Sequence, residues 1–187
     1  QTAAYGFVKG NYRGSVGSGD MYGTAPSGFT TGPWGMGVFG VIPNQSLDPN
    51  PTAGFIPNPG TSLAALLDGT SNTLMASETI VGVNPSATST DMRGFTWWGP
   101  GAVFHGFNTP NSPSPDFHQF ASYCNNLPQQ GLPCAVNTNV QLAARSRHSG
   151  GVNAVMCDAS VRFFTDSVSQ TSWRAFSTAM GGEPVSE

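Results

Sequence analysis

The first stretch of the chain whose residues could do chemistry is rich in oxygen ligands. It runs Asp68-Gly69-Thr70-Ser71-Asn72, and Glu78 follows within the next strand-like segment. Carboxylate and amide oxygens are the ligands that Ca²⁺ prefers. Asp68, Asn72 and Glu78 could therefore hold a calcium ion, although no EF-hand spacing is present.

The second such stretch contains His148, Ser149 and Asp158. A serine hydrolase could in principle combine Ser149 or Ser71 with this histidine and aspartate. The chain has no Gly-x-Ser-x-Gly elbow, and Ser149 follows His148 directly, so its side chain points elsewhere. We therefore expect a protein that is not an enzyme.

His148 and Asp158 are separated by a glycine-rich turn and one strand, which is about 20 Å of extended chain. They should not touch each other. Two interpretations stay open. Each residue could contact the first stretch, or His148 could bond a backbone carbonyl while Asp158 satisfies the amides of its own turn.

Other candidates lie between these stretches. Trp97, Trp98, Phe104 and Phe107 could form an exposed platform for a glycan, although such residues more often belong to the core. His105 and His118 fall in loop sequence, and we expect both to be solvated.

The three cysteines indicate an oxidising compartment. Cys124 and Cys134 flank an irregular segment that a disulfide would tether, the alternative being two reduced thiols. Cys157 ends an apolar run and is expected to be a small buried residue.

Composition excludes several classes of protein. Only 9% of the residues are charged, with 7 Lys+Arg against 10 Asp+Glu. A net charge of −3 cannot supply the phosphate contacts of a nucleic-acid-binding protein. No apolar run is long enough to span a bilayer. The 12 Phe argue against disorder, whereas 24 Gly and 15 Pro favour strands and long loops.

Local patterns predict an α+β fold in a single domain spanning 1–187. A short helix is expected near 62–67, and strands near 73–80, 93–98, 152–157 and 160–165 are expected to form an antiparallel sheet. Asp158 and Ala159 would be the two-residue turn of a hairpin, and Ser169 or Thr171 would open a second short helix. A long loop region covers about 105–143, where functional residues often reside.

These motifs together resemble a large bacterial family of prepilin-like proteins of unknown function. The resemblance rests on Asp68, Gly69, Thr70, Ser71, Asn72 and Glu78, and on His148 followed by Asp158 before the last strand. The family normally has glycine where this chain has Ala159. It is similar to type IV pilins and type II secretion pseudopilins.

The resemblance implies a pilin-like head and a structural role without enzymatic activity. The subunit would assemble with copies of itself, or with related subunits, into a filament, a surface layer or a secretion apparatus. The resemblance also implies an extracytoplasmic location and an apolar N-terminal helix that this chain lacks; that helix, with the one near 62–67, would cover the sheet. Membrane contact would occur only through the missing helix, and no nucleic acid is expected. The alternative is an extracellular module that binds a glycan or a calcium-bridged ligand.

Overall fold

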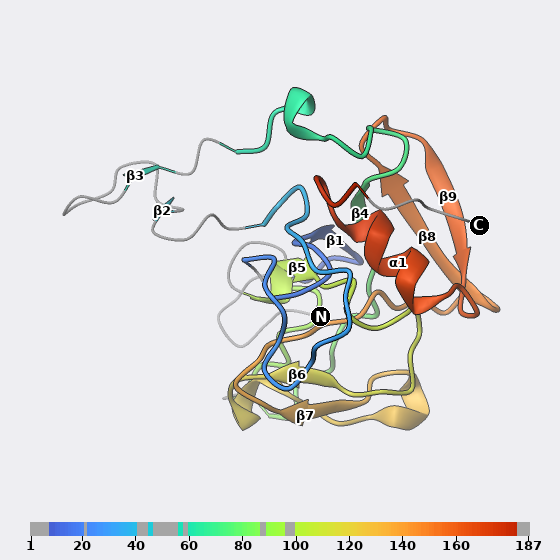
Figure 1. Ribbon diagram of the computed structural model, residues 1–187. Coiled ribbons are helices and arrows are strands. Elements are labelled where there is room, and N and C mark those ends of the chain that lie inside the picture. Colours follow the sequence, from blue (N-terminus) through green and yellow to red (C-terminus); the bar gives the residue numbers. More distant parts are fainter. Residues whose placement is uncertain are drawn as a thin grey trace.

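The computed structural model describes residues 8–20, 22–40, 45–46, 56–57, 60–86, 89–95 and 100–182. It has the α+β architecture that the patterns predict (Figure 1). A five-stranded sheet has the order β5-β1-β4-β8-β9 and packs against one helix, α1. Within these residues, no helix is long and apolar enough to cross a bilayer. The bounds are β1 Tyr12–Ser15, β4 Leu74–Glu78, β5 Val103–Phe104, β8 Gly151–Met156, β9 Val161–Thr165 and α1 Gln170–Ser177.

Smaller elements lie outside this sheet. Two further strand pairs are each parallel, β2 with β3 and β6 with β7. The pair β6–β7 and its loops lie at the opposite end of the molecule from the β8–β9 hairpin (Figure 1). Their bounds, with those of the short 3-10 helices, are β2 Gln45–Ser46, β3 Ile56–Pro57, β6 Asp116–His118, β7 Cys134–Val136, η1 Leu63–Ala65, η2 Pro100–Ala102, η3 Ala121–Tyr123 and η4 Pro128–Gln130.

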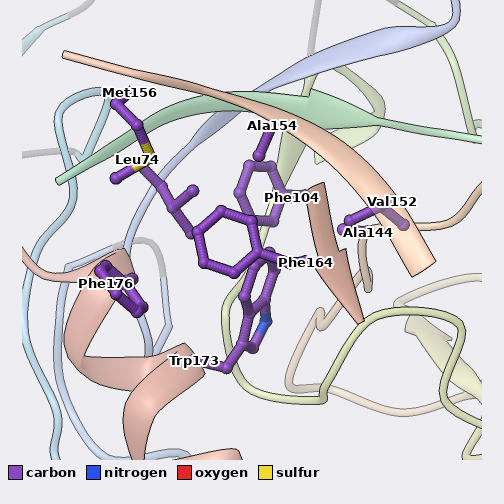
Figure 2. Close-up of a cluster of buried hydrophobic side chains, with 9 residues drawn as sticks. All are labelled: Leu74, Phe104, Ala144, Val152, Ala154, Met156, Phe164, Trp173 and Phe176. Carbon is purple, nitrogen blue, oxygen red and sulfur yellow. The ribbon is translucent and has the colours of Figure 1, made fainter. Parts of the chain in front are cut away.

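Helix α1 covers one face of the sheet and closes the core. Ser169 caps it, because its hydroxyl accepts a hydrogen bond from the Ser172 amide at 3.0 Å. Trp173 and Phe176, one turn apart, pack around Phe164 of β9 with ring centroids 5.3 and 5.2 Å away. Figure 2 shows the resulting cluster, which comprises Leu74, Phe104, Ala144, Val152, Ala154, Met156, Phe164, Trp173 and Phe176.

The opposite face of the sheet, here called the outer face, has no covering element among the described residues. Strand register places Tyr12, Glu78, Asn153 and Phe163 in one row across β1, β4, β8 and β9. The adjacent row is Val103, Gly14, Ala76, Val155 and Val161. Phe39 lies over Gly14, where an added Cβ would come within 2.5 Å of its ring.

The structure corrects two expectations about the sheet. The sheet is mixed and not purely antiparallel, because β1 and β5 run parallel. Residues 93–95 form a turn: Gly94 has φ +85°, and the Phe95 amide donates to the Met92 carbonyl. The rest of the segment predicted at 93–98 lies outside the described residues.

The helix predicted near 62–67 is only the 3-10 turn η1. Its Leu63 is 70% exposed, so η1 does not cover the core as we expected. The β8–β9 connection also differs from the prediction, because Met156 and Ser160 pair through their backbones and enclose a three-residue loop. Ala159 adopts φ +67° in this loop, a position that normally favours glycine.

Candidate functional site

Glu78 joins three segments at the end of β4. Its Oε2 accepts the Asn153 amide at 2.7 Å, which extends the β4–β8 pairing through a side chain. Its backbone carbonyl accepts the Arg145 amide at 3.0 Å. Because Glu78 is only 9% exposed, the Asn153 amide satisfies a carboxylate that would otherwise be costly to bury.

His148 contacts the same carboxylate, as one of the two sequence interpretations predicts. Its Nε2 lies 3.0 Å from Glu78 Oε1, although the histidine side chain is 56% exposed and the glutamate side chain only 12%. Ser146 holds this turn, since its hydroxyl accepts from the His148 amide and donates to the Gly151 carbonyl. The outer face therefore carries a fixed Glu–His pair at its edge.

A groove of about 470 Å³ opens beside this pair; we call it the His148 groove. Its polar wall contains Arg147, the most exposed basic side chain of the described residues, together with His148. The lining residues are Asn11, Tyr12, Glu78, Thr79, Ile80, Val81, Arg145, Ser146, Arg147 and His148.

Asp158 lies at the other end of β8, where it stabilises its own turn. Its carboxylate accepts the Ser160 amide at 2.9 Å and the Ser160 hydroxyl at 2.6 Å. These bonds lower the pKa of Asp158. The Asp158 amide also donates to the Thr70 carbonyl, so the second motif contacts the first motif here as well.

Asp68 hydrogen-bonds the segment that follows α1. Its carboxylate accepts the amides of Gly181 and Gly182 at 2.9 and 2.7 Å. The Asn72 side chain donates to the Asp68 carbonyl and not to a shared ligand position. Gly69 makes the turn possible with φ +87°, and Ser71 points into solvent.

The predicted calcium ligands therefore do not converge. Asp68 is engaged by residues 181–182, whereas Glu78 sits at the far end of β4, whose five residues alone span about 13 Å. Asn72 bonds a backbone carbonyl. No cluster of three or more His, Cys, Asp or Glu able to hold a metal occurs in the part of the chain that the structure describes.

A catalytic arrangement of Ser149 or Ser71 with His148 and Asp158 is not assembled either. His148 and Asp158 lie at opposite ends of β8. His148 Nε2 bonds to Glu78, and Asp158 bonds to Ser160. His148 and Asp158 instead each connect their own segment to the first motif.

Sequence reasoning missed a buried ion network, which we call the core ion network. It consists of Arg13, Arg93, Arg145, Asp91 and Asp116, all at most 2% exposed. Arg145 forks onto Asp116 with contacts of 3.0 to 3.2 Å. Arg93 binds Asp91 at 2.6 Å and reaches Asp116 at 3.5 Å. These arginines hold the pKa of Asp116 below its usual range despite complete burial.

His105 and His118 are buried in this region, which contradicts the expectation that both are solvated. They are 1% and 0% exposed. The His105 Nδ1 accepts the Leu142 amide at 3.2 Å. Burial lowers the pKa of His105 to about 3 and that of His118 to about 4, so both are neutral at pH 7.

The disulfide between Cys124 and Cys134 is present, as predicted. It closes the loop that supplies the Asn125 carbonyl to Arg93 at 2.7 Å and the Asn126 side chain to the Cys134 amide. The crosslink therefore positions a loop around the core ion network. Cys157 is half-buried, less than predicted, and burial raises its pKa.

The predicted glycan platform is not formed as such. Phe104 and Phe107 are 0% and 4% exposed, and Trp97 and Trp98 lie outside the described residues. Phe107 instead belongs to a different arrangement, in which Arg174 lies 4.3 Å from the Trp34 ring and 5.1 Å from the Phe107 ring. A groove of about 480 Å³ next to it is lined by Phe29, Thr30, Thr31, Asn108 and Gln170, among others.

The described residues thus form an α+β fold in which the motif residues bond to other parts of the same chain. The chain belongs to the family described as protein of unknown function (DUF1559), whose profile matches residues 4–171. No curated protein matches the chain, and no solved structure does.

Proposed function

We propose that this chain is the extracytoplasmic head of a pilin- or pseudopilin-like subunit with a structural, non-enzymatic role. It would assemble with copies of itself or with related subunits into a filament, a surface layer or a type II secretion-like apparatus. The observation that carries the proposal is the outer face of the sheet.

The outer face carries exposed apolar side chains along one row and at both ends of the other row, whose centre is Glu78 and Asn153. Tyr12, Phe39, Val161 and Phe163 are each between 50% and 65% exposed. A mostly apolar groove of about 370 Å³ runs between Tyr12, Phe39 and Val103. Contiguous apolar surface on a folded domain marks a contact with another molecule. Among the described residues, strand β9 pairs only with β8 and so leaves an edge at the side of this face.

The distribution of charge supports close packing between subunits. Five of the seven basic side chains are at most 7% exposed: Lys9, Arg13, Arg93, Arg145 and Arg174. Most of the chain's few basic side chains are therefore buried. The surface carries fewer positive charges than the composition alone suggests. Low surface charge weakens the repulsion that keeps proteins apart in solution.

Two further observations support the location and the structural role. A disulfide persists in oxidising compartments, which supports an extracytoplasmic location. The side chains of Asp68, Glu78 and His148 bond to other segments of the same chain, and that of Asp158 bonds within its own turn, which supports a role in shaping the head.

The experiment compares Phe163→Glu with Leu67→Glu in the full-length gene product in its own bacterium. Both side chains are exposed, but Leu67 lies in the turn before β4, away from the outer face. Electron microscopy of the cell-surface fraction should show regular assemblies for wild type and Leu67→Glu, and their loss for Phe163→Glu. Assemblies that persist in Phe163→Glu, or none in wild type, would reject the proposal.

A glycan-binding module is the second candidate, favoured by the groove beside Arg174. Phe29 is 46% exposed at its rim, and hydroxyl and amide side chains line its walls. Aromatic faces surrounded by such groups suit sugar rings. Binding on a glycan array that Phe29→Ala abolishes would support this role, whereas an array without hits would remove it.

A further inference from the structure

Arg13 is a buried cation whose guanidinium is only partly bonded. It lies on the core side of β1 and is 2% exposed. Its Nη2 donates to the Ala143 carbonyl at 2.8 Å. Its Nε and Nη1 have no hydrogen-bond partner among the described residues. A guanidinium has five N–H donors, so most of this buried group's donors need an acceptor.

The core ion network contains one more positive charge than negative charges. Arg93 pairs with Asp91 and Asp116, and Arg145 pairs with Asp116. Arg13 makes no ion pair with a described carboxylate within 4 Å. The network thus holds three guanidinium groups against two carboxylates, and an unpaired buried charge costs several kcal/mol.

The neighbouring histidines do not change this balance. Both are neutral at pH 7, since burial lowers their pKa to about 3 and about 4. Burial lowers the pKa of Arg13 to about 10, which still leaves it charged at pH 7. The excess is therefore a single positive charge at Arg13.

Unbonded polar atoms also occur on three residues of β1, β6 and the segment before Ala143, and His118 is close enough to Arg13 to interact with it electrostatically. Ser15 lies two residues along β1, so its hydroxyl shares the face of Arg13. His118 follows Phe117, and Phe117 pairs with Gln141. Gln141 precedes by two residues Ala143, whose carbonyl accepts from Arg13. The unbonded atoms here are Ser15 Oγ, both ring nitrogens of His118, Gln141 Oε1, and Nε and Nη1 of Arg13.

Donors dominate this set. Arg13 presents its Nε–H and both Nη1–H groups, Ser15 adds a hydroxyl, and neutral His118 adds one N–H. The acceptors are Gln141 Oε1 and the second nitrogen of His118. A donor-rich, positively charged and solvent-excluded position attracts an anion. Since these residues are at most 2% exposed, the anion must be small.

We propose that Arg13, Ser15 and His118 bind a single monovalent anion of the size of chloride inside the domain. The ion neutralises Arg13 and completes the hydrogen bonding of the β1–β5 edge against the segment at 141–143. It is a structural ligand that favours the folded state, and its existence does not depend on the pilin-like role.

Thermal unfolding of the purified chain in chloride or gluconate, at equal ionic strength, tests the site. Ligand that binds only the folded state raises the melting temperature with its concentration. We expect a rise with chloride for wild type and for the control Arg147→Gln, whose side chain is exposed. Arg13→Gln, which removes the positive charge, should show no chloride dependence.

A crystal grown in bromide keeps the proposal testable if Arg13→Gln does not fold. An anomalous peak within hydrogen-bond distance of Arg13 Nε or Nη1 is the expected result. A water at this position without anomalous signal would overturn the proposal, as would a chloride response that Arg13→Gln retains.

Discussion

Glu78 and His148 form one contact, but the two side chains should differ greatly in what they contribute. Glu78 is buried and accepts the Asn153 amide, whereas His148 is more than half exposed. Removing a buried acceptor leaves a donor unsatisfied, while exposed pairs contribute little.

We therefore predict that Glu78→Ala lowers the free energy of unfolding by about 2 kcal/mol. His148→Ala should lower it by less than about 1 kcal/mol. Urea unfolding at pH 7 measures both changes. Equal losses would mean that Glu78 stabilises the fold only through His148.

Stability should fall in mild acid because His105 and His118 are buried in the neutral form. Their pKa values are lowered to about 3 and about 4, against about 6.5 in the unfolded chain. The unfolded state therefore binds more protons below pH 6.5. Stability is fully present above that pH and is lost as the pH falls toward 4.

Melting temperatures measured from pH 7.5 to pH 4 check this prediction. We expect a progressive drop below pH 6.5, and a smaller drop for His118→Gln than for wild type. A melting temperature that stays constant down to pH 4.5 would contradict the burial of the two neutral histidines.

At the residue scale, the sequence left two interpretations of His148 and Asp158 open, and it did not predict the burial of His105 and His118. The span between His148 and Asp158 already implied separate partners, and both residues do contact the first motif. A single histidine in loop sequence carries no periodicity that reports burial. The available signal was charge scarcity, because a chain with few charges can still place them in structural ion pairs.

The β8–β9 hairpin offers the clearest test of a single element. Ala159 adopts φ +67°, which an L-residue with a Cβ adopts at a cost of roughly 1–2 kcal/mol. Ala159→Gly should therefore raise the free energy of unfolding by about 1 kcal/mol.

Ala121→Gly is the matched control, since Ala121 is exposed and has no positive φ. It should leave stability unchanged or slightly lower it. Chemical denaturation measures the free energy of unfolding of both variants. A loss of stability in Ala159→Gly would mean that the turn is not strained.

The elements differ in how well the sequence predicts them, for physical reasons. Strands β8 and β9 alternate apolar residues around a turn, and Ser169 gives α1 a recognisable cap. Strand β1 places Arg13 and Ser15 on its buried side, so its pattern does not resemble a strand. Its parallel pairing with the two-residue β5 depends on contacts between distant segments.

For the whole molecule, the disulfide stabilises the loops around the core ion network. Replacing Cys124 and Cys134 by serine should lower the free energy of unfolding by about 2–3 kcal/mol. The Asn125 carbonyl would then be less firmly held against Arg93. Equilibrium unfolding of the double variant, with Cys157→Ser as control, measures the loss, and an unchanged midpoint would exclude a stabilising role.

In the assembled state, we propose, another subunit covers the outer face. This proposal is tested most directly by a photo-activated crosslinking residue placed at position 163 in the full-length protein in intact cells, with position 67 as control. We expect crosslinks from position 163 to a second copy or to a related pilin-like subunit, and none from position 67. Position 163 crosslinking to no such subunit, although the protein is made and folded, would contradict it.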